Sequence, residues 1–141
     1  DIVTIDTGLI YQGYFLDAAR TIIVGNTGDT KSKQLVDATR EALQAAISVV
    51  RPGKHIGDIG AAVMRVAANR RFAIVKDLGG HAVGEAVHGM VLAIEPMLAE
   101  GKGAIILDED EWTYRMKDKK RAAHFEDTVL VTETGTEILT Q

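Results

Sequence analysis

Four acidic side chains stand in segments of this sequence that otherwise read as apolar β-strands. Asp6 and Asp17 lie 11 residues apart on either side of a turn signal at Tyr11-Gln12-Gly13. Glu95 and Glu126 are each a single acid within a strongly strand-forming apolar run. A carboxylate in such a place is costly unless it is paired, hydrogen-bonded or bound to a metal. Four such acids, in a chain that also holds histidines, predict a shared functional site.

Each acid also has a simpler explanation. Asp6 and Asp17 can be solvent-exposed or can pair with Arg20, and a single acid in a strand can be an edge charge that prevents aggregation. A turn near residues 11–12 would bring the two aspartates close to opposite each other on one face of a hairpin. Two like charges destabilise such a pairing, so we expect a cation between them.

The four histidines occur in different surroundings. His81 and His88 lie in the apolar, glycine-rich segment 79–97. Because glycines allow close backbone approach, we expect both imidazoles to project into a cleft. His124 lies two residues before Glu126, hence on the same strand face, and is either a partner of a site residue or a filler. His55 follows a helix stop and is expected at the surface.

The acids and one histidine form an oxygen-rich ligand set with a single nitrogen, which suits Mn(II), Fe(II), Co(II) or Zn(II). Its members are Asp6, Asp17, His81, Glu95 and Glu126. The chain has no cysteine, so thiolate ligands are excluded. Two divalent ions would neutralise the four carboxylates, which predicts a dinuclear site. Two metals that share a water lower its pKa and polarise a carbonyl oxygen, which is hydrolytic chemistry. A neutral His88 outside the coordination sphere can donate to a developing oxyanion.

These side chains need a scaffold of strands, and the hydrophobic pattern supplies one. We expect a hairpin over residues 1–7 and 14–24, helices from 29 or 30 to about 50 and from about 58 to 70, and a short strand at 72–75. Further β-segments are expected at 90–98, 104–107, 112–116, 123–132 and 137–139. This order predicts an α+β fold in which helices pack on one face of a curved, mainly antiparallel sheet.

The composition excludes several classes of protein. With 46% apolar and 26% charged residues, the 141-residue chain can form one domain with a real core. No apolar run approaches the roughly 20 residues of a membrane span, and no signal-peptide pattern opens the chain, so we expect a cytoplasmic protein. A net charge of -4 gives no reason to expect DNA as a partner. The basic cluster Lys117, Lys119, Lys120 and Arg121 is most simply a solvated loop.

With its ligands in the order Asp, Asp, His, Glu, Glu, the chain resembles the type I methionine aminopeptidases, which are pita-bread metallopeptidases. The resemblance covers essentially all 141 residues. It rests on Ile5-Asp6 and Asp17, on Gly80-His81 with His88 seven residues on, on Ile94-Glu95-Pro96-Met97, on Trp112-Thr113 followed by Lys117-Asp118, and on Phe125-Glu126-Asp127-Thr128. Each piece is weak alone, whereas the ordered set is specific.

The resemblance implies a pita-bread fold and two divalent ions, Co, Mn, Fe or Zn, bound by the same five residues. Asp17 and Glu126 would bridge the ions, and Glu95 would also accept a proton from the bridging water. His88 resembles the histidine that contacts the substrate and stabilises the tetrahedral intermediate. The implied reaction removes the N-terminal methionine of a nascent or short peptide whose second residue is small. We also expect a monomer. A weak contact of the basic cluster with ribosomal RNA is the alternative to a solvated loop, since the family's substrates emerge from ribosomes.

Three departures from the family pattern stand out. Ala82 replaces a usual glycine after the histidine ligand. A long loop that relatives carry after the histidine corresponding to His88 is nearly absent between residues 88 and 89. The family's N-terminal half is also absent, and the chain opens at Asp1 in a strand-like pattern. We therefore expect a single catalytic domain, residues 1–141, that is incomplete at its N-terminus and has a loop missing after residue 88.

Two alternatives remain beside this prediction. An aminopeptidase P or prolidase relative shares the ligand order, but such enzymes usually have arginine two residues before the last glutamate, where this chain has His124. Trp112-Thr113 also favours the methionine enzyme. A non-catalytic pita-bread binding module is the second alternative, although such a scaffold has no need of the five ligands that this chain keeps.

Overall fold

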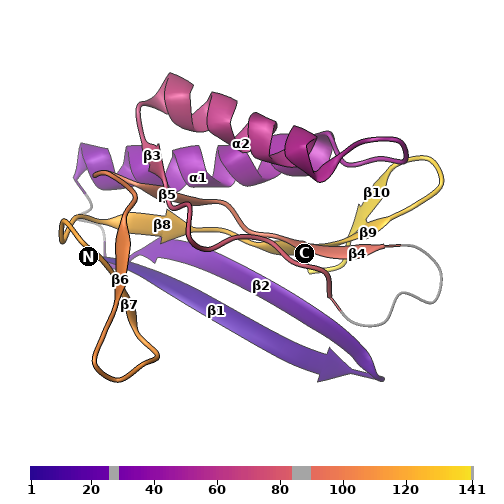
Figure 1. Ribbon diagram of the computed structural model, residues 1–141, viewed down its shortest axis with the longest axis horizontal. Helices are drawn as coiled ribbons and strands as arrows, with labels where there is room; N and C mark the ends of the chain where they lie inside the picture. The colour runs from indigo at the N-terminus through magenta and orange to yellow at the C-terminus, as the bar shows by residue number, and fades with distance from the viewer. Residues whose placement is uncertain (26–28, 84–89, 141) are drawn as a thin grey trace.

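The computed structural model describes residues 1–25, 29–83 and 90–140 of the chain. Two helices lie side by side over one face of a layer of strands, and a long N-terminal hairpin crosses the other face (Figure 1). All strand pairs in the described residues are antiparallel. Neither described helix is long and apolar enough to cross a membrane. The prediction of an α+β fold with helices on one face is confirmed.

The hairpin consists of β1 (Ile2–Tyr11) and β2 (Tyr14–Ile23). Its two-residue turn has φ of 50° at Gln12 and 86° at Gly13, the positive values that a tight hairpin turn requires. Asp6 pairs with Ala19 and Asp17 with Gly8. The two aspartates therefore share one face, as predicted, but they are diagonal neighbours rather than directly opposite residues.

Both predicted helices form. Helix α1 (Thr30–Ser48) begins at Asp29, whose side chain accepts a hydrogen bond of 2.8 Å from the N–H of Ser32. Arg121 bonds the same carboxylate at 2.5 Å, and this contact lowers the pKa of Asp29 to about 2. Helix α2 (Ile56–Arg70) begins two residues before the predicted start, after the exposed His55. The basic cluster is thus only partly solvated, since Arg121 forms ion pairs with Asp29 at the start of α1 and with Glu100 after β5.

The remaining strands are short. They are β3 (Ala73–Ile74), β4 (Val91–Ile94), β5 (Met97–Ala99), β6 (Ile105–Leu107), β7 (Tyr114–Met116), β8 (Ala122–His124), β9 (Asp127–Val131) and β10 (Thr136–Ile138). Strand β4 pairs with β9, and β5 pairs with β8.

The predicted strands 90–98 and 123–132 are each broken in the structure. One break falls at Glu95-Pro96 and the other at Phe125-Glu126, and the two breaks face each other between paired strands. Pro96 has no N–H to donate to a ladder, which explains the first break. Both breaks therefore lie at glutamates that were candidate ligands.

The core lies between the helices and the strand layer. Leu35 from α1, Leu98 from β5 and Val129 from β9 are completely buried within it. Apolar burial of this kind contributes roughly 1.5–3 kcal/mol per large side chain. The packing anchors the strand segments on either side of the two breaks, and so fixes the backbone from which the glutamates project.

Candidate metal centre

The hairpin docks onto the strand layer at the break in front of β9. The N–H of Glu126 donates to the carbonyl of Ala19 at 2.9 Å, and the N–H of Ala19 donates back to the carbonyl of Glu126 at 3.3 Å. Glu126 takes part in neither the β4–β9 nor the β5–β8 pairing and pairs with Ala19 of the hairpin instead. This exchange explains the second strand break and brings Glu126 beneath the face of β2 that carries Asp17.

Two buried threonines extend this docking on either side. The hydroxyl of Thr128 accepts a hydrogen bond of 2.8 Å from the N–H of Asp17 and donates one of 2.7 Å to its carbonyl. The hydroxyl of Thr21 does the same for the N–H and carbonyl of His124, at 2.8 and 2.7 Å. Each threonine side chain thus satisfies both backbone groups of one residue at the site. The positions of Asp17, Glu126 and His124 are fixed together.

His81 reaches the site from the loop before β4. Its carbonyl accepts a 2.8 Å hydrogen bond from the N–H of Ala93. A Cβ built on the preceding Gly80 would overlap the Ala93 carbonyl, so only glycine permits this approach. The prediction that glycine allows a close backbone approach here is confirmed at Gly80, whereas Gly79 has open space around it.

The His81 ring lies among carboxylates. Its Nδ1 is 3.0 Å from the Ala82 carbonyl, which leaves Nε2 with a free lone pair when Nδ1 carries the proton. Nε2 is 3.6 Å from Glu95 Oε1 and 4.0 Å from Asp17 Oδ2. Ligand atoms of Asp17, His81 and Glu126 lie within 4.8 Å of one another.

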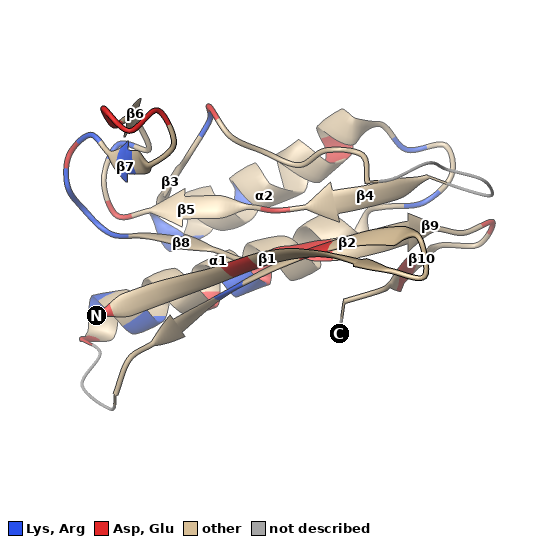
Figure 2. Cartoon of the chain, turned by 90° about the horizontal axis from the view of Figure 1, so that it is seen from below, with Lys and Arg blue, Asp and Glu red and all other residues tan. Residues whose placement is uncertain are grey.

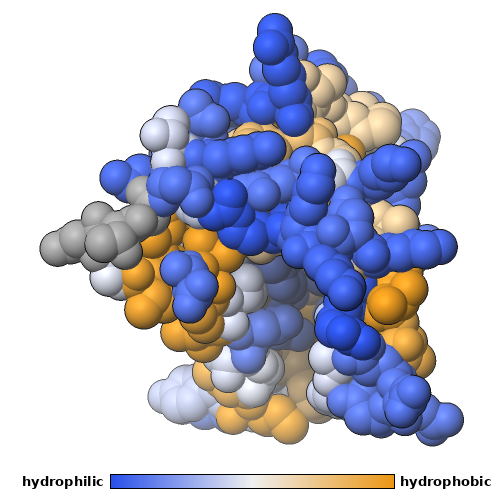
Figure 3. Space-filling model, turned by 90° about the vertical axis from the view of Figure 1, so that its left-hand side faces the viewer, coloured by the Kyte–Doolittle hydropathy of each residue, from blue (hydrophilic) through white to orange (hydrophobic). Residues whose placement is uncertain are grey.

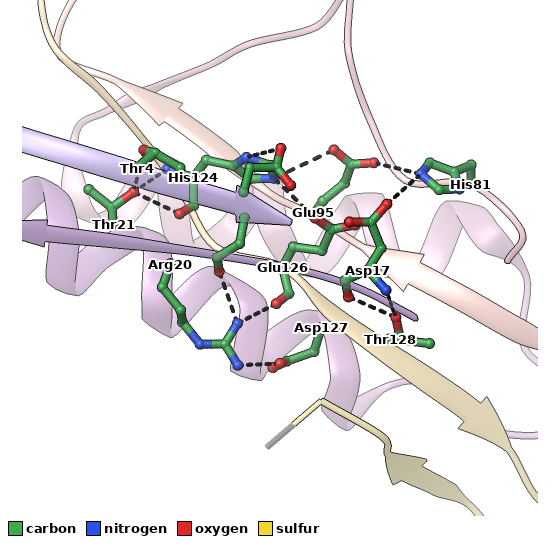
Figure 4. A network of polar contacts seen from close by, with 12 residues as sticks. Thr4, Asp17, Arg20, Thr21, His81, Glu95, His124, Glu126, Asp127 and Thr128 are labelled. Carbon is green, nitrogen blue, oxygen red and sulfur yellow. Dashed lines mark hydrogen bonds and ion pairs between the residues drawn. The ribbon is translucent and has the colours of Figure 1, made fainter. Parts of the chain in front are cut away.

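Glu95 lies between two imidazoles (Figure 4). While its Oε1 faces His81, its Oε2 is 3.5 Å from Nε2 of His124. The same His124 Nε2 is 4.0 Å from Glu126 Oε2, and Nδ1 is 3.8 Å from Asp6 Oδ2. The structure therefore brings together all five candidate ligands and adds His124, with Asp6 at the exposed edge and Glu126 at the buried end.

The position of Glu126 raises the pKa of its carboxyl group. Its side chain is 3% exposed, and burial, together with the charges of Asp17 and Glu95, raises its pKa to about 7, although His124 opposes the shift. Among the described residues, no lysine or arginine forms an ion pair with Asp6, Asp17, Glu95 or Glu126. The cluster is therefore short of positive charge.

The simpler explanation through Arg20 is wrong. Arg20 projects from the other face of β2 and pairs with Asp127 at 2.5 Å, and it also donates to the Ala19 carbonyl at 2.9 Å. Arg20 thus links β2 of the hairpin to β9 on the side of β2 away from the acidic cluster. The expected cation between Asp6 and Asp17 is not this guanidinium.

The donor set fits a divalent metal. Metal–ligand bonds of about 2.1 Å place two ligands of one ion at most about 4.2 Å apart, and the separations from His81 and His124 to their carboxylate neighbours lie within that limit. Most are too long for hydrogen bonds. Nε2 of His124 is buried and has no hydrogen-bond partner within residues 1–25, 29–83 and 90–140. An uncompensated acidic cluster with a free imidazole nitrogen matches what a hard-to-borderline divalent cation binds.

His88, predicted as a substrate contact, lies outside the described residues. His124 was predicted as a partner of a site residue or a filler, and the structure places its ring beside Asp6, Glu95 and Glu126. The signal for this position was its spacing of two residues from Glu126.

A curved antiparallel fold with helices on one face and a cluster of carboxylates and imidazoles defines a candidate metallohydrolase. The sequence profile of metallopeptidase family M24 matches residues 1–133. The chain therefore belongs to metallopeptidase family M24, and its fold is the pita-bread fold of that family.

The chain is similar to several methionine aminopeptidases of this family. Methionine aminopeptidase B of Synechocystis is 41% identical, and the match covers 99% of this chain and 58% of that protein. The crystal structure of methionine aminopeptidase from Thermotoga maritima has a TM-score of 0.93 and 41% identity, covering 99% of this chain and 64% of that chain. A prolidase from Pyrococcus furiosus has a TM-score of 0.74 and 26% identity, covering 99% and 41%.

The matches also show a difference in length. The chain spans about three fifths of the methionine aminopeptidases that it matches. The Synechocystis alignment runs over 159 positions, whereas the chain has 141 residues, so at least 18 aligned positions have no residue in this chain. The prediction that a loop is missing after residue 88 concerns residues outside the described part and stays a prediction.

Proposed function

We propose that the chain is the catalytic part of a methionyl aminopeptidase with a dinuclear metal centre. The observation that carries the proposal is the convergence of Asp17, His81 and Glu126 within 4.8 Å, with Glu95 beside His81. The similarity to methionine aminopeptidases at 41% identity supports the choice of reaction. The cleaved bond is the first peptide bond of a chain that starts with methionine.

Five residues would hold the two ions: Asp6, Asp17, His81, Glu95 and Glu126. Asp17 and Glu126 are the proposed bridging ligands. Bound divalent ions would polarise the substrate carbonyl and lower the pKa of a water molecule. The candidate ions are Mn, Fe, Co and Zn. Glu95 would accept a proton from water at the site, since its side chain is only 11% exposed and faces the cluster with both oxygens. His88 is proposed to donate to the substrate carbonyl, as the resemblance implies.

A pocket beside the cluster suits an apolar substrate side chain. It has a volume of about 800 Å³ and is lined mainly by apolar residues of α2 and of the segments around β3 and β4. His81 and Glu95 also contribute to its wall. An N-terminal methionine placed there would bring its peptide bond next to the proposed ligands.

Peptide hydrolysis tests this proposal. The chain, supplied with Mn(II), Co(II) or Zn(II), is expected to release methionine from Met-Ala-Ser, and EDTA is expected to stop the release. Met-Leu-Ser is the matched substrate with a large second residue, and we expect it to be cleaved more slowly. Cleavage of Ala-Pro-Ser in place of Met-Ala-Ser would favour the aminopeptidase P or prolidase alternative. Metal binding with no hydrolysis of any of these peptides would favour the non-catalytic module.

The proposal extends to the cellular setting, in which a monomer acts in the cytoplasm on nascent chains. The lysines of the basic cluster, Lys117, Lys119 and Lys120, are exposed beside β7, at the end of the molecule that carries β6 and β7 (Figure 2). The surface at this end is largely hydrophilic (Figure 3). A weak contact with ribosomal RNA would use these three lysines. Serine substitution of all three is expected to reduce ribosome co-sedimentation at low salt, and unchanged co-sedimentation would argue for a solvated loop.

A further inference from the structure

His124 is a partly buried ionisable side chain at the site to which the proposed reaction gives no role. Its side chain is 14% exposed, and its Nε2 is buried without a hydrogen-bond partner among the described residues. A buried imidazole nitrogen without a partner is costly, because it has lost water and gained nothing in return. Its position among carboxylates requires an explanation.

The distances around Nε2 are those of ligands that share an ion. Glu95 Oε2 lies at 3.5 Å and Glu126 Oε2 at 4.0 Å, both beyond the 2.7–3.2 Å of ordinary hydrogen bonds to nitrogen. On the other side of Glu95, His81 Nε2 stands in the same relation, 3.6 Å from Oε1. The two carboxylate oxygens of Glu95 thus each face a different imidazole.

The backbone of His124 is held in place by hydrogen bonds to Thr21. Thr21, which is 2% exposed, binds both the N–H and the carbonyl of His124. On the far edge of the ring, Nδ1 faces Asp6 Oδ2 at 3.8 Å, which is too long for a hydrogen bond. The contact leaves Nε2 as the ring nitrogen that points toward Glu95 and Glu126.

We propose that His124 Nε2 is a direct ligand of the second ion, so that each ion of the centre has one imidazole. This inference rests on the proposed metal centre and adds a sixth ligand to it. A second nitrogen favours Zn(II) or Co(II) over Mn(II) at that position, because imidazole suits the former and oxygen ligands the latter. The alternative is that His124 only supports the ligands through hydrogen bonds.

Zinc titration followed by NMR separates the two roles. Zn(II) is diamagnetic, so the ring nitrogens of a chain labelled with ¹⁵N-histidine can be followed without loss of signal. We expect the signals of both His81 and His124 to change to those of metal-bound nitrogen, with saturation at two equivalents of zinc. Signal loss in His81→Gln and His124→Gln identifies each ring. His55→Gln serves as the matched control, since His55 is exposed and precedes α2.

The outcomes are distinct. Binding at His81 with an unchanged His124 ring would overturn the sixth ligand and leave the proposed centre in place. No change at either ring would overturn both. In calorimetry, His124→Gln is expected to weaken the second zinc at least about 10-fold and to leave the first nearly unchanged. If His124→Gln does not fold, the spectrum of the unmodified chain, assigned by sequential NMR methods, still decides between a bound and an unbound ring.

Discussion

Asp17→Asn is expected to lose metal-dependent hydrolysis and to bind the second divalent ion at least about 100-fold more weakly than the unmodified chain. The carboxylate of Asp17 lies 4.0 Å from His81 Nε2 and is the proposed bridge between the ions. An amide has the same shape but no charge and only one oxygen, so it cannot bridge two cations. Isothermal titration with Mn(II) and the rate of methionine release measure the two effects.

The fold should tolerate this change. The backbone of Asp17 is held by the hydroxyl of Thr128 and not by its own side chain. Asp37→Asn is the matched control, because Asp37 on α1 has a side chain that is 64% exposed and only a 3.6 Å contact with Arg40. Equal affinity for the second ion in Asp17→Asn and Asp37→Asn would refute the bridging role.

Glu126→Gln is expected to have opposite effects on stability with and without metal. In the metal-free chain the pKa of Glu126 is raised to about 7, chiefly by burial and then by Asp17 and Glu95. Unfolding returns it to an ordinary value of 4.5. Between these values the folded state binds the additional proton, so the free energy of unfolding falls as pH rises from about 4.5 to about 7 and then levels off.

The size of this effect follows from the two values. A pKa of about 7 against 4.5 corresponds to a loss of about 3 kcal/mol by pH 8, as an order of magnitude. Glutamine has no charge to bury, so metal-free Glu126→Gln should be more stable than the unmodified chain at pH 8 and similar to it at pH 4. Divalent ions should reverse the order, since they stabilise only a chain that binds them.

Urea denaturation in EDTA and in Zn(II), at pH 4, 6 and 8, measures this prediction. Glu137→Gln provides a control, because Glu137 is exposed on β10. A metal-free Glu126→Gln variant that is less stable than the unmodified chain at pH 8 would contradict the uncompensated charge at this position.

The local pattern of the chain was enough to predict the elements that depend on local signals. The turn at Gln12-Gly13 and the helical spacing of apolar residues in α1 place these elements correctly, because turn chemistry and burial periodicity act over a few residues. The candidate ligands Glu95 and Glu126 could also be selected from the sequence, since each is a single acid in an apolar run. These features predict a candidate site before any tertiary contact is known.

The strand breaks at these acids could not be predicted from the same pattern. Residues 123–132 read as one continuous strand, whereas in the structure Glu126 pairs with Ala19, more than 100 residues earlier in the chain, at the point where the strand is interrupted. Thr21 and Thr128 likewise look like ordinary strand formers, whereas their hydroxyls hold the backbones of His124 and Asp17. Such contacts between distant segments decide which polar residues converge, and for that reason the sequence left the role of His124 open between a partner and a filler.

Anomalous diffraction from crystals of the chain grown with Zn(II) is the most direct test of the proposed metal centre. We expect two zinc peaks within about 2.0–2.3 Å of ligand atoms, one beside His81 and both in contact with Glu126. Crystals of Asp17→Asn under the same conditions should lose at least one peak. Zinc bound only at other carboxylates of the surface, with none between Asp17, Glu95 and Glu126, would contradict the metal centre.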